Sequence, residues 1–587
     1  MKRFVAVLFA LTLSIVADPA PTGSVHGVIR EQGGGELPGV TVTLLPPGTS
    51  VVTDTHGRYR FDGLAPATYT VRAQLEGFNA VQRSVTVGAG TSVGLEMVLP
   101  FSALAETITV TASSPPISAM RTASFMVSGA DTAIEPRYRK FDDHGFIEAK
   151  KSRVTTFAID VDRASYANVR RFVSDGLVPP PDAVRVEEMI NYFPWSYPQP
   201  EGSAPFSVTT EVGGCPWNAK NRIVRIGIQG RNLERWKMAA NNLVFLVDVS
   251  GSMQDASRLP LLKSAFRVLV DQLRAEDRVA LVVYAGAAGL VLPSTSGVDK
   301  PTILAALDNL AAGGSTAGGE GIELAYKIAK ENFLADGNNR VILATDGDFN
   351  VGLSGAKALE KLIEKKRDSG IYLSVLGVGD DNYQDDAMET LADKGNGNYA
   401  YLDSIREAEK VFRDELTGTL VTIAKDVKVQ IDFDPARVVS YRQIGYENRA
   451  LANEDFENDE KDAGELGAGH SVTALYEIVP VSSAASPTLA RGPIATLKLR
   501  YKEPNSRKSI PLMTTITDEG HSAWDASPDM QFATAIAQFG MLLRNSPHKG
   551  TATWDDVLKL ASVSRGADLD GTRAEFLKIA EAARGMK

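Results

Sequence analysis

The chain has 587 residues and carries 62 Lys and Arg against 72 Asp and Glu, which gives a formal net charge of −10. This length corresponds to about four folded units, and the acidic balance disfavours nucleic-acid binding, because a nucleic-acid-binding protein needs a basic surface to displace phosphate counterions. The single cysteine, Cys215, excludes an internal disulfide framework and a cysteine-rich zinc module.

Residues 1–20 have the three-part layout of a secretory signal peptide. A basic Met1-Lys2-Arg3 start precedes the apolar run FVAVLFALTLSIV and the short stretch ADPA. The apolar run is shorter than the roughly 20 residues that span a bilayer. We therefore expect a bacterial protein exported to the periplasm or the cell surface, with no transmembrane span after the signal is removed. A retained membrane anchor is the alternative.

Residues 22–100 contain short alternating stretches such as Thr41–Leu44, separated by Gly- and Pro-rich turns, and this pattern predicts a small antiparallel β-sandwich. The segments LPGVTVTL and TDTHGRYRF, the latter at residues 53–61, resemble the carboxypeptidase regulatory-like family. The resemblance implies a fold and little about activity. Two roles are open for this sandwich, a spacer or a contact to envelope polysaccharide.

Residues 101–152 are rich in Ser, Ala, Thr and Pro and are expected to form a linker. The next segment, 153–240, mixes a strand expected at 156–162 with helices expected at 165–174 and 186–193. The last segment, 419–587, begins with strands and ends with helices. Its acidic stretch at 447–465 lacks the spacing of a calcium-binding EF-hand loop, so we interpret it as a solvated loop.

Residues 241–418 alternate apolar strands with amphipathic helices. Strands are expected at 243–247, 279–284, 341–345 and 372–378, and helices at 259–273, 302–310, 321–333, 356–368, 385–392 and 405–416. This alternation predicts a parallel sheet covered by helices on both sides, in a doubly wound, Rossmann-like α/β domain.

Oxygen-bearing side chains collect where ligands bind in such a sheet, beyond the carboxyl ends of its strands. Asp248, Ser250 and Ser252 follow the first strand, Thr316 lies in a glycine-rich loop and Asp346 follows the third strand. Hard oxygen donors suit Mg²⁺, Mn²⁺ or Ca²⁺. Because two carboxylates do not saturate a six-coordinate Mg²⁺ ion, a position should remain for an acidic group from another molecule.

The D-x-S-x-S run, the loop threonine and the T-D-G strand end resemble the von Willebrand factor type A domain with its metal-ion-dependent adhesion site (MIDAS). The resemblance implies that Asp248, Ser250, Ser252, Thr316 and Asp346 are the metal ligands. A degenerate domain, in which Asp248 only caps the next helix, is the alternative. Segments including TTFAIDVDRASYANVRRF, VRVEEMINYFPW and AQFGMLLRNS resemble the bacterial YfbK-like family over 153–587.

These features predict a non-enzymatic binding or adhesion-type protein, which captures an acidic residue of a protein partner through the metal ion. We expect no catalytic residues, because the motif loops contain no His and Asp255 is the nearest spare carboxylate. Two alternatives remain. One is a metal-dependent hydrolase, and the other is a structural envelope module whose ion only stabilises the fold.

Overall fold

The computed structural model describes residues 22–31, 35–45, 49–75, 78, 80–99, 138–285, 287–313, 318–347, 356–379, 384–415, 421–459, 461, 463–481, 491–504 and 506–586. The expected signal peptide at 1–20 and most of the expected linker lie outside these ranges. The chain divides into two compact units, Met1–Thr109 and Val110–Lys587. Each unit is described by itself.

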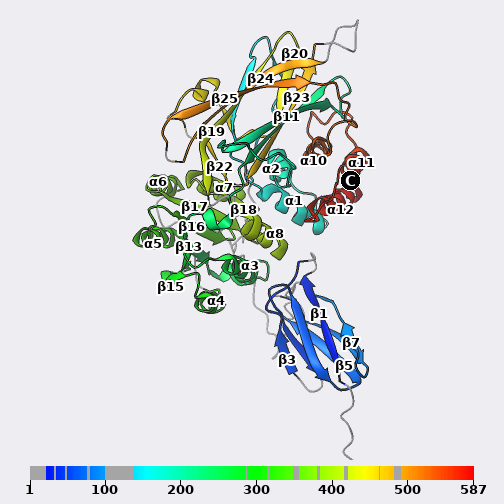
Figure 1. Cartoon of the computed structure of the whole chain (residues 1–587), viewed down its shortest axis with the longest axis vertical. Coiled ribbons are helices and arrows are strands. Elements are labelled where there is room, and N and C mark those ends of the chain that lie inside the picture. Colours follow the sequence, from blue (N-terminus) through cyan, green and yellow to red (C-terminus); the bar gives the residue numbers. More distant parts are fainter. Residues whose placement is uncertain are drawn as a thin grey trace, which may run out of the picture. The chain divides into compact units, whose positions relative to one another are not determined.

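The described part of the N-terminal unit is a β-sandwich, as the alternating pattern predicts (Figure 1). One sheet has the order β4-β1-β7, with β8 also paired to β1, and the other has the order β3-β2-β5-β6. Ile29 from the first sheet and Val42 and Val71 from the second are fully buried in the core. The strands are β1 (Gly23–Glu31), β2 (Thr41–Leu45), β3 (Thr49–Val52), β4 (Arg58–Leu64), β5 (Ala67–Gln74), β6 (Val81–Val87), β7 (Ser92–Gly94) and β8 (Met97–Leu99).

Strand pairing in this sandwich is antiparallel, with two exceptions. Strand β1, which is antiparallel to β4, runs parallel to both β7 and β8. The chain reaches β7 from β6, a strand of the other sheet. A strand that arrives from the opposite sheet is not joined to its neighbour by a hairpin, so it can run parallel to it.

The second unit contains two antiparallel sheets that share one apolar core, to which Val429 and Leu497 contribute from the first sheet and Val224 and Tyr476 from the second. The first sheet has the order β21-β10-β19-β24-β25, with β22 on β19, and the second has the order β11-β12-β23-β20-β9. The strands are β9 (Ile147–Glu148), β10 (Val154–Ala158), β11 (Phe206–Gly214), β12 (Arg222–Gly230), β19 (Thr422–Phe433), β20 (Val438–Ile444), β21 (Ala450–Leu451), β22 (Gly464–Gly467), β23 (Ser471–Pro480), β24 (Gly492–Lys502) and β25 (Ser509–Asp518).

The segments on either side of the part that resembles a type A domain (residues 241–418, the type A domain) fold together. Strand β10 pairs with β19, and β12 pairs with β23, so each sheet combines strands from before and after residues 241–418. The type A domain is therefore inserted into a body that both flanking segments build.

Helices cover the outer face of the sheet that contains β12 and β23 (Figure 1). They are α1 (Ala164–Ser174), α2 (Val186–Asn191), α10 (Pro528–Leu543), α11 (Trp554–Val563) and α12 (Thr572–Gly585). Helix α10 begins after Ser527, whose side chain accepts a hydrogen bond from the Met530 amide, with Pro528 at the first helical position. Its side chains are buried from Asp529 to Leu543, because α10 lies between the sheet and the other helices.

The type A domain is a doubly wound sheet with the strand order β15-β14-β13-β16-β17-β18. Helix α5 packs against the Val244 and Leu246 face of β13, whereas Phe266 of α3 contacts Phe245 on the other face. The elements are β13 (Asn241–Asp248), α3 (Leu259–Gln272), β14 (Arg278–Tyr284), β15 (Ala288–Ser296), α4 (Lys300–Asp308), α5 (Gly318–Glu331), β16 (Asn338–Thr345), α6 (Ala356–Arg367), β17 (Ile371–Gly377), α7 (Asp385–Lys394), β18 (Tyr399–Tyr401) and α8 (Ile405–Glu409), which continues as a π-helix over Lys410–Glu415.

The edge strand β15 departs from the expected all-parallel sheet, because it pairs antiparallel with β14. Only residues 285–287 separate the two strands. So short a connection allows a hairpin but not the crossover that a parallel pair needs.

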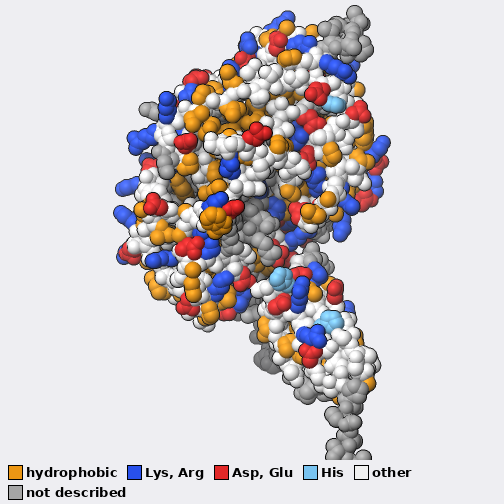
Figure 2. Space-filling model, viewed as in Figure 1, with side chains coloured by type: hydrophobic (Ala, Val, Ile, Leu, Met, Phe, Trp, Pro, Cys, Tyr) orange, Lys and Arg blue, Asp and Glu red, His pale blue; other side chains and the backbone are white. Residues whose placement is uncertain are grey.

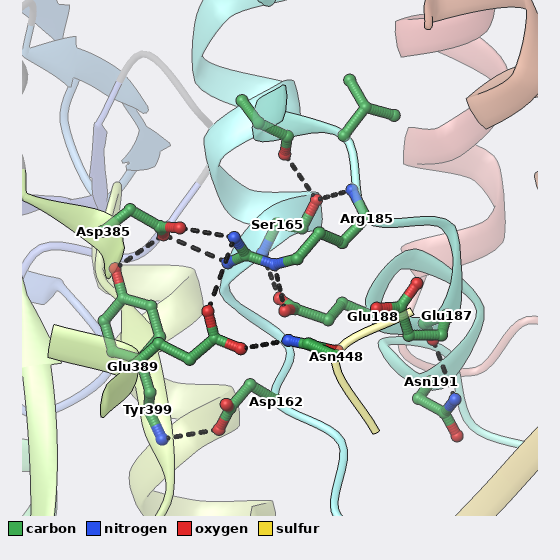
Figure 3. Close-up of polar contacts among 12 residues, drawn as sticks. Asp162, Ser165, Arg185, Glu187, Glu188, Asn191, Asp385, Glu389, Tyr399 and Asn448 are labelled. Atoms are coloured by element: carbon green, nitrogen blue, oxygen red, sulfur yellow. Dashed lines mark hydrogen bonds and ion pairs between the residues drawn. The ribbon is translucent and has the colours of Figure 1, made fainter. Parts of the chain in front are cut away.

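A buried network of charged side chains joins the type A domain to the α1–α2 segment (Figure 3). Arg185, at the start of α2, pairs with Glu188 of the same helix and with Asp385 of α7. Arg449 pairs with Asp162 at 3.0 Å and with Asp393 of α7 at 2.7 Å. Helix α7 is therefore held against the rest of the unit by ion pairs shielded from water.

The carboxylate Asp162 is drawn into this network, and β10 ends earlier than the strand expected at 156–162. Asp162 is buried, and it accepts hydrogen bonds from the Tyr399 amide at 2.9 Å and from Arg449. The Glu447–Arg449 end of the acidic stretch also contacts α7, through Asn448 and Glu389. That end of the stretch is a junction rather than a solvated loop.

A glycine before β18 allows two backbones to approach closely. A Cβ atom at Gly397 would lie 1.7 Å from the Leu373 carbonyl oxygen, so the Gly397→Ala substitution forces β17 and the turn apart. We expect it to lower the free energy of unfolding by about 1–3 kcal/mol, measured by urea denaturation. Gly145→Ala is the control, because a Cβ there meets nothing within 4 Å. Equal stability of the two variants would contradict this reading.

None of the helices in the described part of the chain is both long and apolar enough to cross a membrane. On the face seen in Figure 2, acidic and basic side chains are interspersed.

Candidate metal centre

The D-x-S-x-S residues converge at the carboxyl end of β13. Asp248 is fully buried, and its Oδ1 accepts a hydrogen bond from the Ser250 amide at 2.8 Å. The hydroxyls of Ser250 and Ser252 lie 3.0 Å apart. Three successive oxygen-bearing side chains are thus gathered in one tight loop, as their spacing of two residues predicts.

The carboxylate Asp346 follows β16, the parallel neighbour of β13, and it is buried beside Asp248. The Thr345 hydroxyl donates to Asp248 Oδ2 at 3.2 Å and accepts from the Gly347 amide at 3.1 Å, which ties the two strand ends together. Burial raises the pKa of Asp248, and the negative charge of Asp346 raises it further, while hydrogen bonds from Ser250 oppose the shift. Such a pair gains stability from an added positive charge.

The fifth predicted ligand, Thr316, lies outside the described residues. The described residue nearest to it on the amino-terminal side is Gly313, whose amide donates to the Val249 carbonyl at 2.7 Å. Gly313 therefore lies directly beside the Asp248–Ser252 loop.

These residues fit a hard divalent cation. In an octahedral Mg²⁺ site with bonds of about 2.1 Å, neighbouring ligand oxygens lie about 3 Å apart, which matches the 3.0 Å between the Ser250 and Ser252 hydroxyls. Among the described residues, no group of three or more His, Cys, Asp or Glu is placed to hold a metal ion. A site at this position would therefore depend on hydroxyl ligands and on two carboxylates.

One residue of the site, Arg258, was not predicted from the sequence. Arg258, buried at the start of α3, donates from Nη1 to Asp346 Oδ2 at 3.1 Å and to the Ser252 carbonyl at 2.7 Å. No motif marks this arginine, because its contact with Asp346 joins residues 88 positions apart.

The spare carboxylate near the site, Asp255, has a local structural role. Its Oδ1 accepts hydrogen bonds from the Ser257 amide at 2.8 Å and the Ser257 hydroxyl at 2.7 Å, an arrangement that shapes the turn before α3. Asp255 stays the carboxylate that the sequence suggests as the base of a hydrolase. The expectation that the protein is not an enzyme remains a prediction.

Comparison with family models divides the chain in the same order as the structure. The carboxypeptidase regulatory-like domain matches residues 24–100, a model described as von Willebrand factor matches 133–225, the von Willebrand factor type A domain matches 242–414, and the C-terminal domain of the uncharacterized protein YfbK matches 418–586.

The chain is 43% identical over 474 residues to the uncharacterized protein YfbK of Escherichia coli K12, covering 77% of this chain and 81% of that protein. An uncharacterized protein of Synechocystis sp. is 29% identical over 200 residues, 34% of this chain and 46% of its own length. Among solved structures, a von Willebrand factor type A protein from Catenulispora acidiphila is 16% identical with a TM-score of 0.38, covering 64% of this chain and 91% of its own. The conserved hypothetical protein BatB from Bacteroides thetaiotaomicron is 25% identical with a TM-score of 0.26, covering 30% and 97%. The identity and coverage shared with the E. coli protein, together with the matching domain models, establish that this chain belongs to the YfbK family.

Proposed function

We propose that the chain is an exported, non-enzymatic binding protein that captures an acidic group of a protein partner through a divalent metal ion. Mg²⁺ is the preferred ion, and Mn²⁺ or Ca²⁺ are the alternatives. The ion would be held by Asp248, Ser250, Ser252, Thr316 and Asp346. Export rests on the amino-terminal sequence alone. The convergence of the Asp248, Ser250 and Ser252 oxygens at the end of β13 carries the proposal.

The protein's part in this mechanism is to preorganise ligands. The Ser250 amide and the Thr345 hydroxyl orient the Asp248 carboxylate, so that its oxygens are fixed before an ion arrives. Ser250 and Ser252 offer neutral oxygens and leave most of the ion's charge uncompensated. When bound, the ion would supply a Lewis-acidic position for the partner's carboxylate.

Loss of the Asp248 carboxylate tests the metal site. We expect Asp248→Ala to abolish Mg²⁺ and Mn²⁺ binding in isothermal titration calorimetry, because it removes one of two charged ligands and the anchor of the loop. Asp255→Ala is the matched control, since it removes a carboxylate of the same loop, one that accepts hydrogen bonds from Ser257. Unchanged Mg²⁺ affinity in Asp248→Ala would refute the proposed site.

The capture step is tested on the full chain with proteins of a bacterial envelope extract. We expect partners that the wild type retains in Mg²⁺ to be released by EDTA, and to be absent with Asp248→Ala. Recovery of the same partners in Mg²⁺ and in EDTA would favour a structural role for the ion. Esterase, phosphatase or peptidase turnover that disappears in Asp346→Ala would favour the hydrolase.

A further inference from the structure

A positive charge is already present within the candidate metal centre. The Arg258 guanidinium bridges the two loops that carry the predicted ligands, through Asp346 Oδ2 on one side and the Ser252 carbonyl on the other. Its side chain is 6% exposed and that of Asp346 is 1% exposed, so water screens this ion pair poorly.

The space around this arginine is shaped for it. Gly379, two residues after β17, has a φ of +81°, and a Cβ atom at this position would lie 2.6 Å from Arg258 Nε. The Tyr401 hydroxyl donates to the Gly379 carbonyl at 2.8 Å and fixes that turn. The absence of a side chain at Gly379 thus leaves room for the buried Arg258 side chain.

We propose that Arg258 is the resident counter-cation of the metal centre, which neutralises Asp346 without metal and competes with a divalent ion for that carboxylate. The inference rests on the proposed function, since it concerns the same site. Asp248 and Asp346 are two buried like charges at adjacent strand ends, and a guanidinium offsets one of them. A divalent ion at the Ser250 and Ser252 hydroxyls would be repelled by that guanidinium, so Arg258 lowers the affinity for metal.

The Arg258→Gln variant separates the two effects of Arg258, which are neutralisation of Asp346 without metal and competition with the metal ion. The ligand in this experiment is Mg²⁺ alone. We expect its dissociation constant for Mg²⁺ to fall about tenfold, because a repelling unit charge is removed. In EDTA we expect its melting temperature to fall by about 2–4 °C, and saturating Mg²⁺ should restore it. Arg258→Lys keeps the charge and should bind Mg²⁺ like the wild type.

Arg274→Met is the matched control for stability. Arg274 forms a similarly shielded pair with Asp277 at 2.8 Å, but it lies beyond the far end of α3. Its loss should lower the melting temperature equally in EDTA and in Mg²⁺.

Any of three results would refute the proposed competition between Arg258 and the metal ion. They are unchanged or weaker Mg²⁺ binding by Arg258→Gln, a loss of stability that Mg²⁺ does not restore, and a variant that is unfolded both in EDTA and in Mg²⁺. If instead the wild type binds no Mg²⁺ at all, the proposed function itself fails. If the wild type binds Mg²⁺ and Arg258→Gln binds it with the same dissociation constant, the proposed function stands and only the role of Arg258 is refuted.

Discussion

Substitution of Arg185 by Met should destabilise the 110–587 unit by about 3–5 kcal/mol, because removing one partner of a buried ion pair leaves the other charge without compensation. Arg185 is 2% exposed and Asp385 is fully buried, and the pair joins α2 to α7 across the junction (Figure 3). The free energy of unfolding from urea denaturation, followed by tryptophan fluorescence, measures the loss.

An exposed arginine provides the control for this experiment. Arg584 also contacts two acids, Asp555 and Glu581, but its side chain is 43% exposed, so Arg584→Met should leave the urea midpoint nearly unchanged. If Arg185→Met were as stable as Arg584→Met, the junction would not depend on its ion pairs.

The same junction should make stability depend on pH, falling as the pH rises from 5 to 8. Burial and, to a smaller extent, the negative charge of Glu447 together raise the pKa of Glu187 to about 7. Burial also raises the pKa of Glu188 to about 7 against the opposing effect of Arg185, and that of Asp393 to about 7 against Arg449.

Stability falls with rising pH because the pKa values of these carboxyls are raised in the folded state. In the unfolded chain these carboxyls ionise near pH 4, so between about pH 4 and 7 the folded state binds more protons than the unfolded state. Stability is therefore highest below this window and is lost as the pH rises through it. We expect each of these carboxyls to contribute a loss of about 1–3 kcal/mol between pH 5 and 8, measured by urea denaturation at fixed ionic strength.

Glu187→Gln isolates one of these groups. Glu187 is buried, and its Oε2 has no hydrogen-bond partner among the described residues. The isosteric amide cannot ionise, so the variant should show a shallower pH dependence than the wild type. A slope equal to that of the wild type would exclude Glu187 as a source, and stability that rises from pH 5 to 8 would contradict the direction of all these shifts.

The architecture of the type A domain, and the edge of the sheet at which the motif residues lie, could be predicted because both follow from short-range pattern. Apolar runs such as Leu243–Val247 lie in fully buried parallel strands, and motif residues directly after such strands must lie at one edge of the sheet. The placement of Asp248, Ser250, Ser252 and Asp346 agrees with that argument.

What escaped the sequence analysis depends on contacts between distant residues. The pairing of β10 with β19 and the ion pair of Arg185 with Asp385 join segments 200 or more positions apart, and local periodicity carries no sign of either. The edge strand β15 was missed for a different reason. Only Leu292 of this strand is buried, and its sequence AGLVLPSTS does not alternate apolar with polar residues, so no pattern marks it as a strand.

A crystal structure of the full chain grown with Mn²⁺, with anomalous scattering data, tests the metal centre most directly. We expect a single anomalous peak at the end of β13, about 2.1 Å from the hydroxyl oxygens of Ser250 and Ser252, with Thr316 and Asp346 close by. A map with no peak there at millimolar Mn²⁺, while Asp248, Ser250 and Ser252 keep the arrangement described above, would contradict the metal-dependent function.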